Sequence, residues 1–110
     1  MASQYDRGRR WEWTVRDDLR EKGYDVGRTA GSKSPIDLFA VPRKGQGLLF
    51  IQCKLNEHIS ESNRLKYRDY CLRAGADPII ADRVKEGRRF VIRYRRVLFN
   101  GELSGDHVSP

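Results

Sequence analysis

The stretch of residues 42–47 most constrains the fold, because it is rich in proline, glycine and basic residues and separates two short apolar segments. These segments, residues 36–41 and 48–54, are rich in β-forming residues. Two such segments joined by a short turn-forming stretch predict a β-hairpin. An antiparallel pair of strands therefore lies near the middle of the chain.

Helical and extended patterns flank this hairpin. Trp11, Val15 and Leu19 recur every four positions within residues 8–21, which predicts an amphipathic helix. The other predicted elements are a strand over residues 24–28, a helix over 61–74 that a Gly-Ala-Asp-Pro stretch ends, and strands over 79–84 and 89–97. The order is αβββαββ. A strand reached through a helix usually joins the sheet by a crossover, so we expect an α/β fold with a mixed central β-sheet flanked by helices.

A chain of 110 residues allows one compact domain with a single core. We expect a single domain over residues 1–99 and a loosely held C-terminal tail over residues 100–110, where Ser, Gly, Asp and Pro gather. Since no second domain fits, any second half of a working site comes from another copy of the chain.

The chain is basic, with 22 Lys and Arg against 15 Asp and Glu, a formal net charge of +7. This balance favours a polyanionic partner, with nucleic acid first, although a basic protein without such a partner stays an alternative. Cys53 and Cys71 are too few for a disulfide scaffold and lack zinc-site spacing, which indicates a reducing cytoplasm. No apolar run reaches the roughly 18 residues of a membrane span, and the chain starts without a signal-peptide pattern, so we expect no membrane partner and no export.

Three polar side chains are expected to converge across the hairpin. Asp37 opens its first strand, and Gln52 and Lys54 close the second. Strand alternation places Gln52 and Lys54 on one face and Cys53 on the other, and hairpin pairing can bring Asp37 beside Gln52. Magnesium prefers oxygen ligands and keeps several waters, so Asp37, Gln52 and the Cys53 backbone carbonyl are candidate ligands. Lys54 is then placed to orient an attacking water.

These residues resemble a known nuclease motif. Pro35-Ile36-Asp37 followed by Gln52-Cys53-Lys54 is similar to the PD-(D/E)XK motif, with one extra residue before the aspartate and glutamine in place of the second acid. The wider chain, from about residue 8 to about residue 95, resembles archaeal-type Holliday junction resolvases. That likeness rests on the order and spacing of Gly8, Glu12, Gly23-Tyr24, Arg28, Ala30-Gly31-Ser32-Lys33 and Asp37.

The resemblance implies a restriction-endonuclease-like core and a homodimer that cuts four-way DNA junctions with Mg2+, or Mn2+ as a substitute, and with no small-molecule cofactor. It also implies that the helix residue Glu12 joins the metal site and that Arg28 contacts a DNA phosphate. In the following loop, Ser32 and Lys33 would lie near the DNA. A viral member acting in the host cytoplasm is possible on this resemblance.

Position 13 departs from the family pattern. Relatives usually carry an arginine directly after the helix glutamate, where this chain has Trp13. The phosphate contact of that arginine is then lost or is supplied by Arg9, Arg10 or Arg16. Glu12 and Arg28, taken alone, also fit ordinary exposed surface charges.

The second predicted helix carries more apolar residues than one core contact needs. Tyr67, Tyr70 and Ala74 lie with Cys71 on a stripe distinct from Leu65 and Leu72. A two-fold interface would use this surplus, and in the resolvases the corresponding helix contributes to the dimer. We therefore expect Tyr67, Tyr70 and Ala74 at a dimer interface, although a monomer that buries both stripes on one sheet remains an alternative.

Two other functions remain open. One is a nuclease of the same superfamily that acts on flaps, single strands or duplex DNA. The other is a catalytically weak DNA-binding module on the same scaffold, which the neutral Gln52 and the aromatic Trp13 would favour. If Gln52 is simply a weaker ligand, Gln52→Glu lowers the magnesium requirement; if its amide also donates a hydrogen bond, the substitution raises it.

Overall fold

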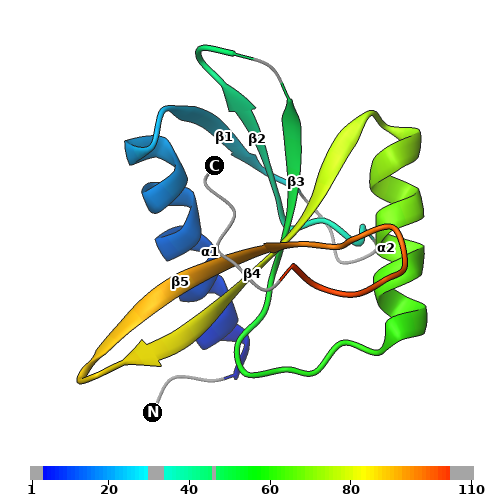
Figure 1. Ribbon diagram of the computed structural model, residues 1–110. Helices are drawn as coiled ribbons and strands as arrows, with labels where there is room; N and C mark the ends of the chain where they lie inside the picture. The colour runs from blue at the N-terminus through cyan, green and yellow to red at the C-terminus, as the bar shows by residue number, and fades with distance from the viewer. Residues whose placement is uncertain (1–3, 30–33, 46, 105–110) are drawn as a thin grey trace.

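The computed structural model describes residues 4–29, 34–45 and 47–104. The order αβββαββ is confirmed (Figure 1). The elements are α1 (Gln4–Glu21), β1 (Tyr24–Arg28), β2 (Leu38–Pro42), β3 (Leu48–Cys53), α2 (Glu61–Arg73), β4 (Ala76–Glu86) and β5 (Arg89–Arg96). Neither helix is long and apolar enough to cross a membrane, within this described part of the chain.

The strands form one mixed sheet in the order β1-β2-β3-β4-β5. The hairpin β2–β3 is antiparallel with Leu38 opposite Ile51, and β3 pairs in parallel with β4 from Leu48 opposite Ala76. A parallel pair needs a crossover connection, and α2 supplies it. The sheet is thus the expected mixed one.

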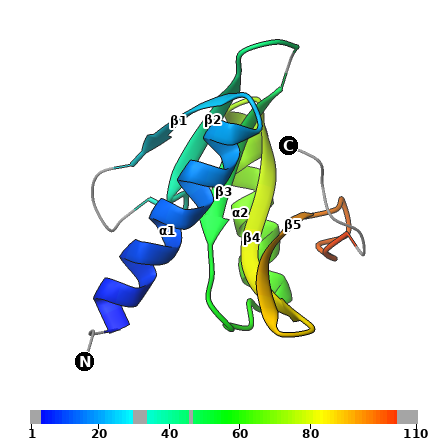
Figure 2. The ribbon, with the colours of Figure 1, turned by 90° about the vertical axis from the view of Figure 1, so that its left-hand side faces the viewer.

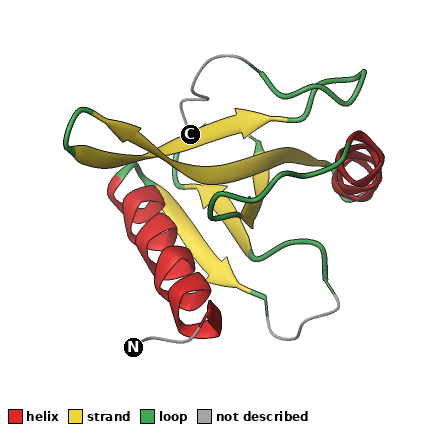
Figure 3. Cartoon of the chain, turned by 90° about the horizontal axis from the view of Figure 1, so that it is seen from below, coloured by secondary structure: helices red, strands yellow, loops and turns green. Residues whose placement is uncertain are grey.

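The two helices cover opposite faces of the sheet, as Figures 2 and 3 show. On the α1 face, Trp11, Val15 and Leu19 pack with inward residues of the strands in the larger core cluster. On the α2 face, Tyr67 and Cys71 belong to a smaller cluster. The expected helix stripe of the N-terminal region is therefore confirmed as core.

The structure corrects two strand boundaries. Ile36 and Asp37 come before β2 rather than within it, although the Asp37 N–H still donates to the Ile51 carbonyl at 2.9 Å. β4 runs from Ala76 to Glu86 and is longer at both ends than residues 79–84. Its start pairs with β3 and its end pairs with β5, so each extension finds hydrogen-bond partners that the local sequence does not reveal.

Residues 100–104, which we expected in the loose tail, contact α2 and β5. Arg64 Nε donates to the Gly101 carbonyl at 2.6 Å, and Leu103 forms a bridge with Val97. A Cβ at Gly101 would lie 3.0 Å from the Leu65 side chain. The packed part of the chain thus extends to Ser104, and residues 105–110 lie outside the described residues.

Tyr67 belongs to the core of this chain and not to an exposed stripe. It is 3% exposed, and its hydroxyl shares its single proton between the carbonyls of Phe50 and Ile79, each 2.8 Å away. This corrects the expectation that Tyr67 contributes to a dimer interface. Tyr70 is half-buried and Ala74 is exposed, so those two residues remain available to a partner.

Tyr67→Phe should lower the free energy of unfolding by about 1–3 kcal/mol, because it leaves two buried carbonyls on neighbouring strands without their donor. Urea unfolding followed by circular dichroism measures the change. The matched control is Tyr70→Phe on the same helix, which should change stability less. Equal stability of the native and Tyr67→Phe proteins would show that the hydroxyl does not stabilise the β3–β4 pair.

Candidate active site

Asp37 lies at the end of the sheet where β2 begins and β3 ends. Its backbone N–H donates to Ile51, and its carbonyl accepts from the Thr29 N–H at 3.1 Å. Its Oδ2 accepts the Cys53 N–H at 2.7 Å. The backbone of three strand ends therefore fixes both the position and the direction of this carboxylate.

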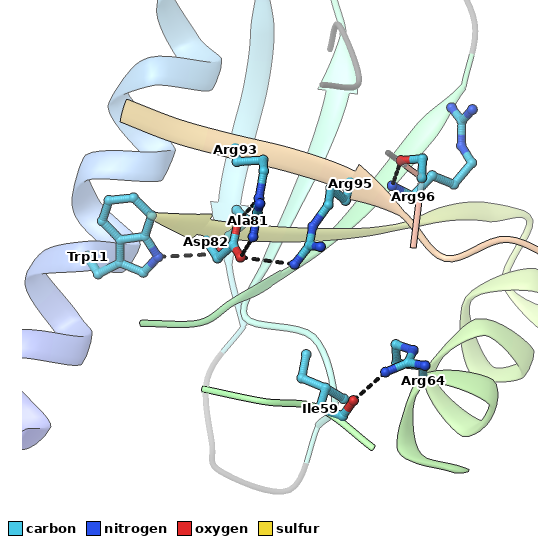
Figure 4. Close-up of polar contacts among 9 residues, drawn as sticks. Trp11, Ile59, Arg64, Ala81, Asp82, Arg93, Arg95 and Arg96 are labelled. Carbon is cyan, nitrogen blue, oxygen red and sulfur yellow. Dashed lines mark hydrogen bonds and ion pairs between the residues drawn. The ribbon is translucent and has the colours of Figure 1, made fainter. Parts of the chain in front are cut away.

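A cavity of about 340 Å³ opens beside Asp37 between the first half of α1 and the end of β3. Glu12, Asp37, Cys53 and Lys54 all line it, together with Arg7, Gly8, Trp11, Leu55, Asn56, Glu57 and Arg83. Trp11 lines the cavity from α1, and its indole N–H donates to the Ala81 carbonyl at 3.3 Å (Figure 4). Glu12, Asp37 and Lys54 thus line one cavity.

Burial raises the pKa of the Asp37 carboxyl, and the nearby Glu12 raises it further. The hydrogen bond from Cys53 and the positive charges of Lys54 and Arg28 oppose this change in pKa. A carboxylate in such a place favours a cation that neutralises its charge.

Glu12 reaches the site from α1 and is paired with Arg28. The Arg28 Nε donates to Glu12 Oε1 at 3.0 Å, and this ion pair joins α1 to the end of β1. Arg28, expected to contact DNA phosphate, therefore lies beside the candidate site and is held by one of its carboxylates.

Lys54 lines three cavities, one of which is the cavity of Asp37. Its backbone N–H donates to the Ala81 carbonyl at 2.9 Å, and its Nζ lies 3.5 Å from Glu57 Oε2, an exposed partner. Its side chain lines the cavity of Asp37 and also a neighbouring one towards α2. Because its only ion-pair partner among the described residues is the exposed Glu57, the Lys54 ammonium is available to a phosphate or a water at the Asp37 carboxylate.

Gln52 lies on the α2 side of Lys54 and lines the neighbouring cavity, not the one that Asp37 lines. Its Nε2 donates to the Pro35 carbonyl at 3.0 Å, and its Oε1 is buried without a hydrogen-bond partner among the described residues. The expected grouping of Gln52 with Asp37, with Cys53 facing away, is therefore not what the structure shows. The reason is that Asp37 precedes β2, so its side chain turns over the end of β3 to Cys53.

Cys53 lies in the same cavity as Asp37 and Glu12. Burial raises the pKa of its thiol well above the ordinary value, and the two carboxylates raise it further. A thiol with a raised pKa is a poor nucleophile, so we do not expect Cys53 to attack a substrate.

The expected DNA-binding residues divide into two groups. Arg10 is exposed on α1, and the Arg9 guanidinium lies 5.7 Å from the ring centre of Trp13, which is 42% exposed. Ser32 and Lys33 lie outside the described residues. Arg7, on α1, and Arg83, on β4, also line the candidate site and were not predicted from the sequence; for Arg83 the reason is that only the tertiary fold brings β4 beside α1.

The donor set fits a hard divalent cation. Glu12 and Asp37 offer carboxylate oxygens, and magnesium is commonly held by one or two carboxylates, several waters and substrate phosphates. Among residues 4–29, 34–45 and 47–104 no cluster of three or more His, Cys, Asp or Glu side chains is placed to hold a metal ion. A metal at this site would therefore depend on Glu12, Asp37, neutral oxygens and its own waters.

Comparisons with known proteins identify the family and the fold. The family model described as archaeal Holliday junction resolvase (Hjc) matches residues 3–100. Among solved structures, Hjc of Archaeoglobus fulgidus, a Holliday junction resolvase from an archaeal hyperthermophile, superposes with a TM-score of 0.62 and 24% identity over 80% of this chain and 70% of that chain. No curated protein sequence matches the chain.

A mixed sheet between two helices, with this family match, defines a nuclease with a restriction-endonuclease-like core. The chain belongs to the archaeal Holliday junction resolvase family. The sequence resemblance to these resolvases is thereby confirmed.

Asp37→Asn should increase stability at neutral pH, because the raised pKa means that the folded state disfavours the ionised carboxyl. The destabilisation from ionised Asp37 is fully present above the folded-state pKa, and it disappears as the pH falls below the pKa of about 4 that aspartate has in the unfolded chain. Urea unfolding in EDTA at pH 7 and near pH 4 should therefore show a stabilisation that shrinks with acidification. Asp25→Asn, at an exposed site, is the control. A variant less stable than the native protein at pH 7 would contradict this origin of the pKa shift.

Proposed function

We propose that the chain is a metal-dependent endonuclease that cuts four-way DNA junctions as a homodimer, with magnesium as its natural ion and manganese as a substitute. The observation that supports it most is the convergence of Glu12, Asp37 and Lys54 on one cavity in a member of the resolvase family. We further propose that it acts inside the cell, whether cellular or viral in origin. Its cysteines, Cys53 and Cys71, are free.

In this proposal Glu12 and Asp37 would hold the metal, which would supply positive charge at the phosphate under attack. The buried setting of Asp37 makes a cation at its carboxylate more favourable than at an exposed one. Lys54 orients the attacking water and balances the negative charge that grows on the phosphate oxygens. Arg28 exchanges its contact with Glu12 for a DNA phosphate.

Gln52 supports the site indirectly in this proposal. Its hydrogen bond to Pro35 fixes the turn that carries Asp37 two residues later. Its buried Oε1 remains as an acceptor for a water or a metal, on the side of Lys54 that faces α2.

Asp37→Asn and Lys54→Ala should each lower cleavage of a four-way junction by at least about 100-fold, because each removes charge that the transition state needs. Junction binding should stay within a few-fold, since phosphate contacts elsewhere supply most of the affinity. Single-turnover cleavage of an end-labelled immobile junction measures the first and electrophoretic mobility shift the second. Asp25→Asn and Lys44→Ala, at exposed sites by the β2–β3 turn, are the controls and should cut normally. Full cleavage by either site variant would reject the assignment.

Gln52→Glu should raise the magnesium concentration for half-maximal cleavage, because a carboxylate cannot donate to Pro35 and would place negative charge beside that carbonyl. Metal titrations of the native and substituted proteins measure the difference. Gln52→Met, which removes both polar atoms at similar size, separates loss of the hydrogen bond from added charge. A lower magnesium requirement in Gln52→Glu would show instead that Gln52 is a weak direct ligand.

Ala74→Lys should dissociate the homodimer and abolish paired cuts on the two strands of a junction. Ala74 is exposed at the C-cap of α2, where a cation suits the helix dipole, so the substitution should leave the monomer folded. Light scattering on a gel-filtration column gives the mass, and Thr14→Lys on the exposed face of α1 is the control. Paired cleavage by a monomeric protein would contradict the dimer.

A further inference from the structure

The positive charge of the chain is concentrated in one segment. Residues 83–96 contain seven basic residues and one acidic residue, a net charge of +6 in a chain whose total is +7. The other 96 residues together are nearly neutral. Any electrostatic attraction for a polyanion is therefore centred on β4 and β5.

This segment forms a two-stranded ribbon that extends beyond the rest of the sheet. The β3 pairing ends with Cys53 opposite Ala81, whereas β4 and β5 stay paired to Glu86 opposite Arg89. Figure 1 shows the ribbon projecting on the side where α1 begins. Its tip is thus accessible from several directions and lies far from the β2–β3 turn.

The basic residues at the base of the ribbon are paired with acidic residues of the chain. Asp82 accepts from Arg93 at 3.0 and 2.6 Å and from Arg95 at 3.0 Å (Figure 4), and Arg96 lies 3.4 Å from Asp77. Nearer the tip, no ion pair is found for Arg83, Lys85, Arg88 or Arg89 in the part of the chain that the structure describes. Most of the uncompensated positive charge therefore lies towards the tip.

One face of the ribbon leads to the candidate site. Arg83 lines the cavity of Asp37, and Lys85, two residues along β4, lies on the same face. The Arg83 guanidinium lies 4.3 Å from the ring centre of Phe90, a side chain that is 59% exposed. Its Nε is buried and finds no hydrogen-bond partner among the described residues. A guanidinium held against a ring in this way presents its remaining N–H groups in a fixed direction.

We propose that Arg83, Lys85 and Arg88 form a phosphate-binding track that runs from the candidate site to the ribbon tip and holds the DNA arm next to the cleaved bond. The ligand is the sugar-phosphate backbone of a duplex arm, read by charge and not by base sequence. The inference rests on the proposed function, because it assigns the binding surface of that same site.

The test compares two triple variants that each remove three positive charges. Arg83→Gln/Lys85→Gln/Arg88→Gln alters the track, and Lys22→Gln/Arg43→Gln/Lys44→Gln alters exposed cations near the opposite end of the sheet. Binding of each protein to a fluorescent immobile four-way junction is measured by anisotropy in EDTA over a range of NaCl concentrations. The track variant should bind at least about tenfold more weakly near 0.1 M salt, and its log–log salt slope should fall by about 2–3, since each phosphate contact contributes about 0.9. The control triple should change the slope by less than about 1.

Equal slopes for the two triples would overturn the track, since only the total charge would then matter. Urea unfolding checks that the variants fold; if the triple does not, the exposed pair Lys85→Gln/Arg88→Gln should lower the slope by about 2. Magnesium-dependent cutting by the native protein separates the two claims. If the native protein cuts the junction and the track variant binds it as the native protein does, the track alone is rejected. If the native protein neither binds nor cuts the junction, both the proposed function and the track are rejected.

Discussion

The hydrogen bond from the Cys53 N–H to Asp37 Oδ2, 2.7 Å long, is the interaction on which the candidate site depends. It ties the residue before β2 to the last residue of β3. The next residue, Lys54, donates its backbone N–H to Ala81 on β4, so three strands are fixed at one point. α1 packs across that point and adds Glu12, and the parallel pairing that α2 makes possible places β4 beside it.

Much of this arrangement follows from the sequence, because it depends on local pattern. The hairpin predicts that Asp37 and Lys54 meet, and they line one cavity. The positions of Gln52 and Tyr67 could not be predicted in the same way. Asp37 lies just outside the strand, where the alternation of side chains between the two faces no longer applies. Tyr67 lies in the core, where its hydroxyl is hydrogen-bonded to carbonyls of the two strands that α2 connects. Arg83 joins the site from a distant strand, a relation that only the tertiary fold creates.

The site has few carboxylates, and ionisation of one of them, Asp37, is unfavourable in the folded protein. Burial and Glu12 raise the pKa of Asp37, so its ionised form is costly until a cation arrives. In this structure Glu12 is paired with Arg28. The neutral Gln52 contributes a hydrogen bond to the turn and no charge. In the function that we propose, such a site would favour a metal that binds together with the phosphates of the substrate, and the basic ribbon would hold those phosphates nearby.

Cleavage of one four-way junction with and without magnesium tests the central claim most directly, when a linear duplex of the same arm sequences is incubated in parallel. We expect symmetric cuts on two opposing strands of the junction, dependent on the ion, and no comparable cutting of the duplex. Cutting that persists in EDTA, or that is as fast on the duplex as on the junction, would contradict it.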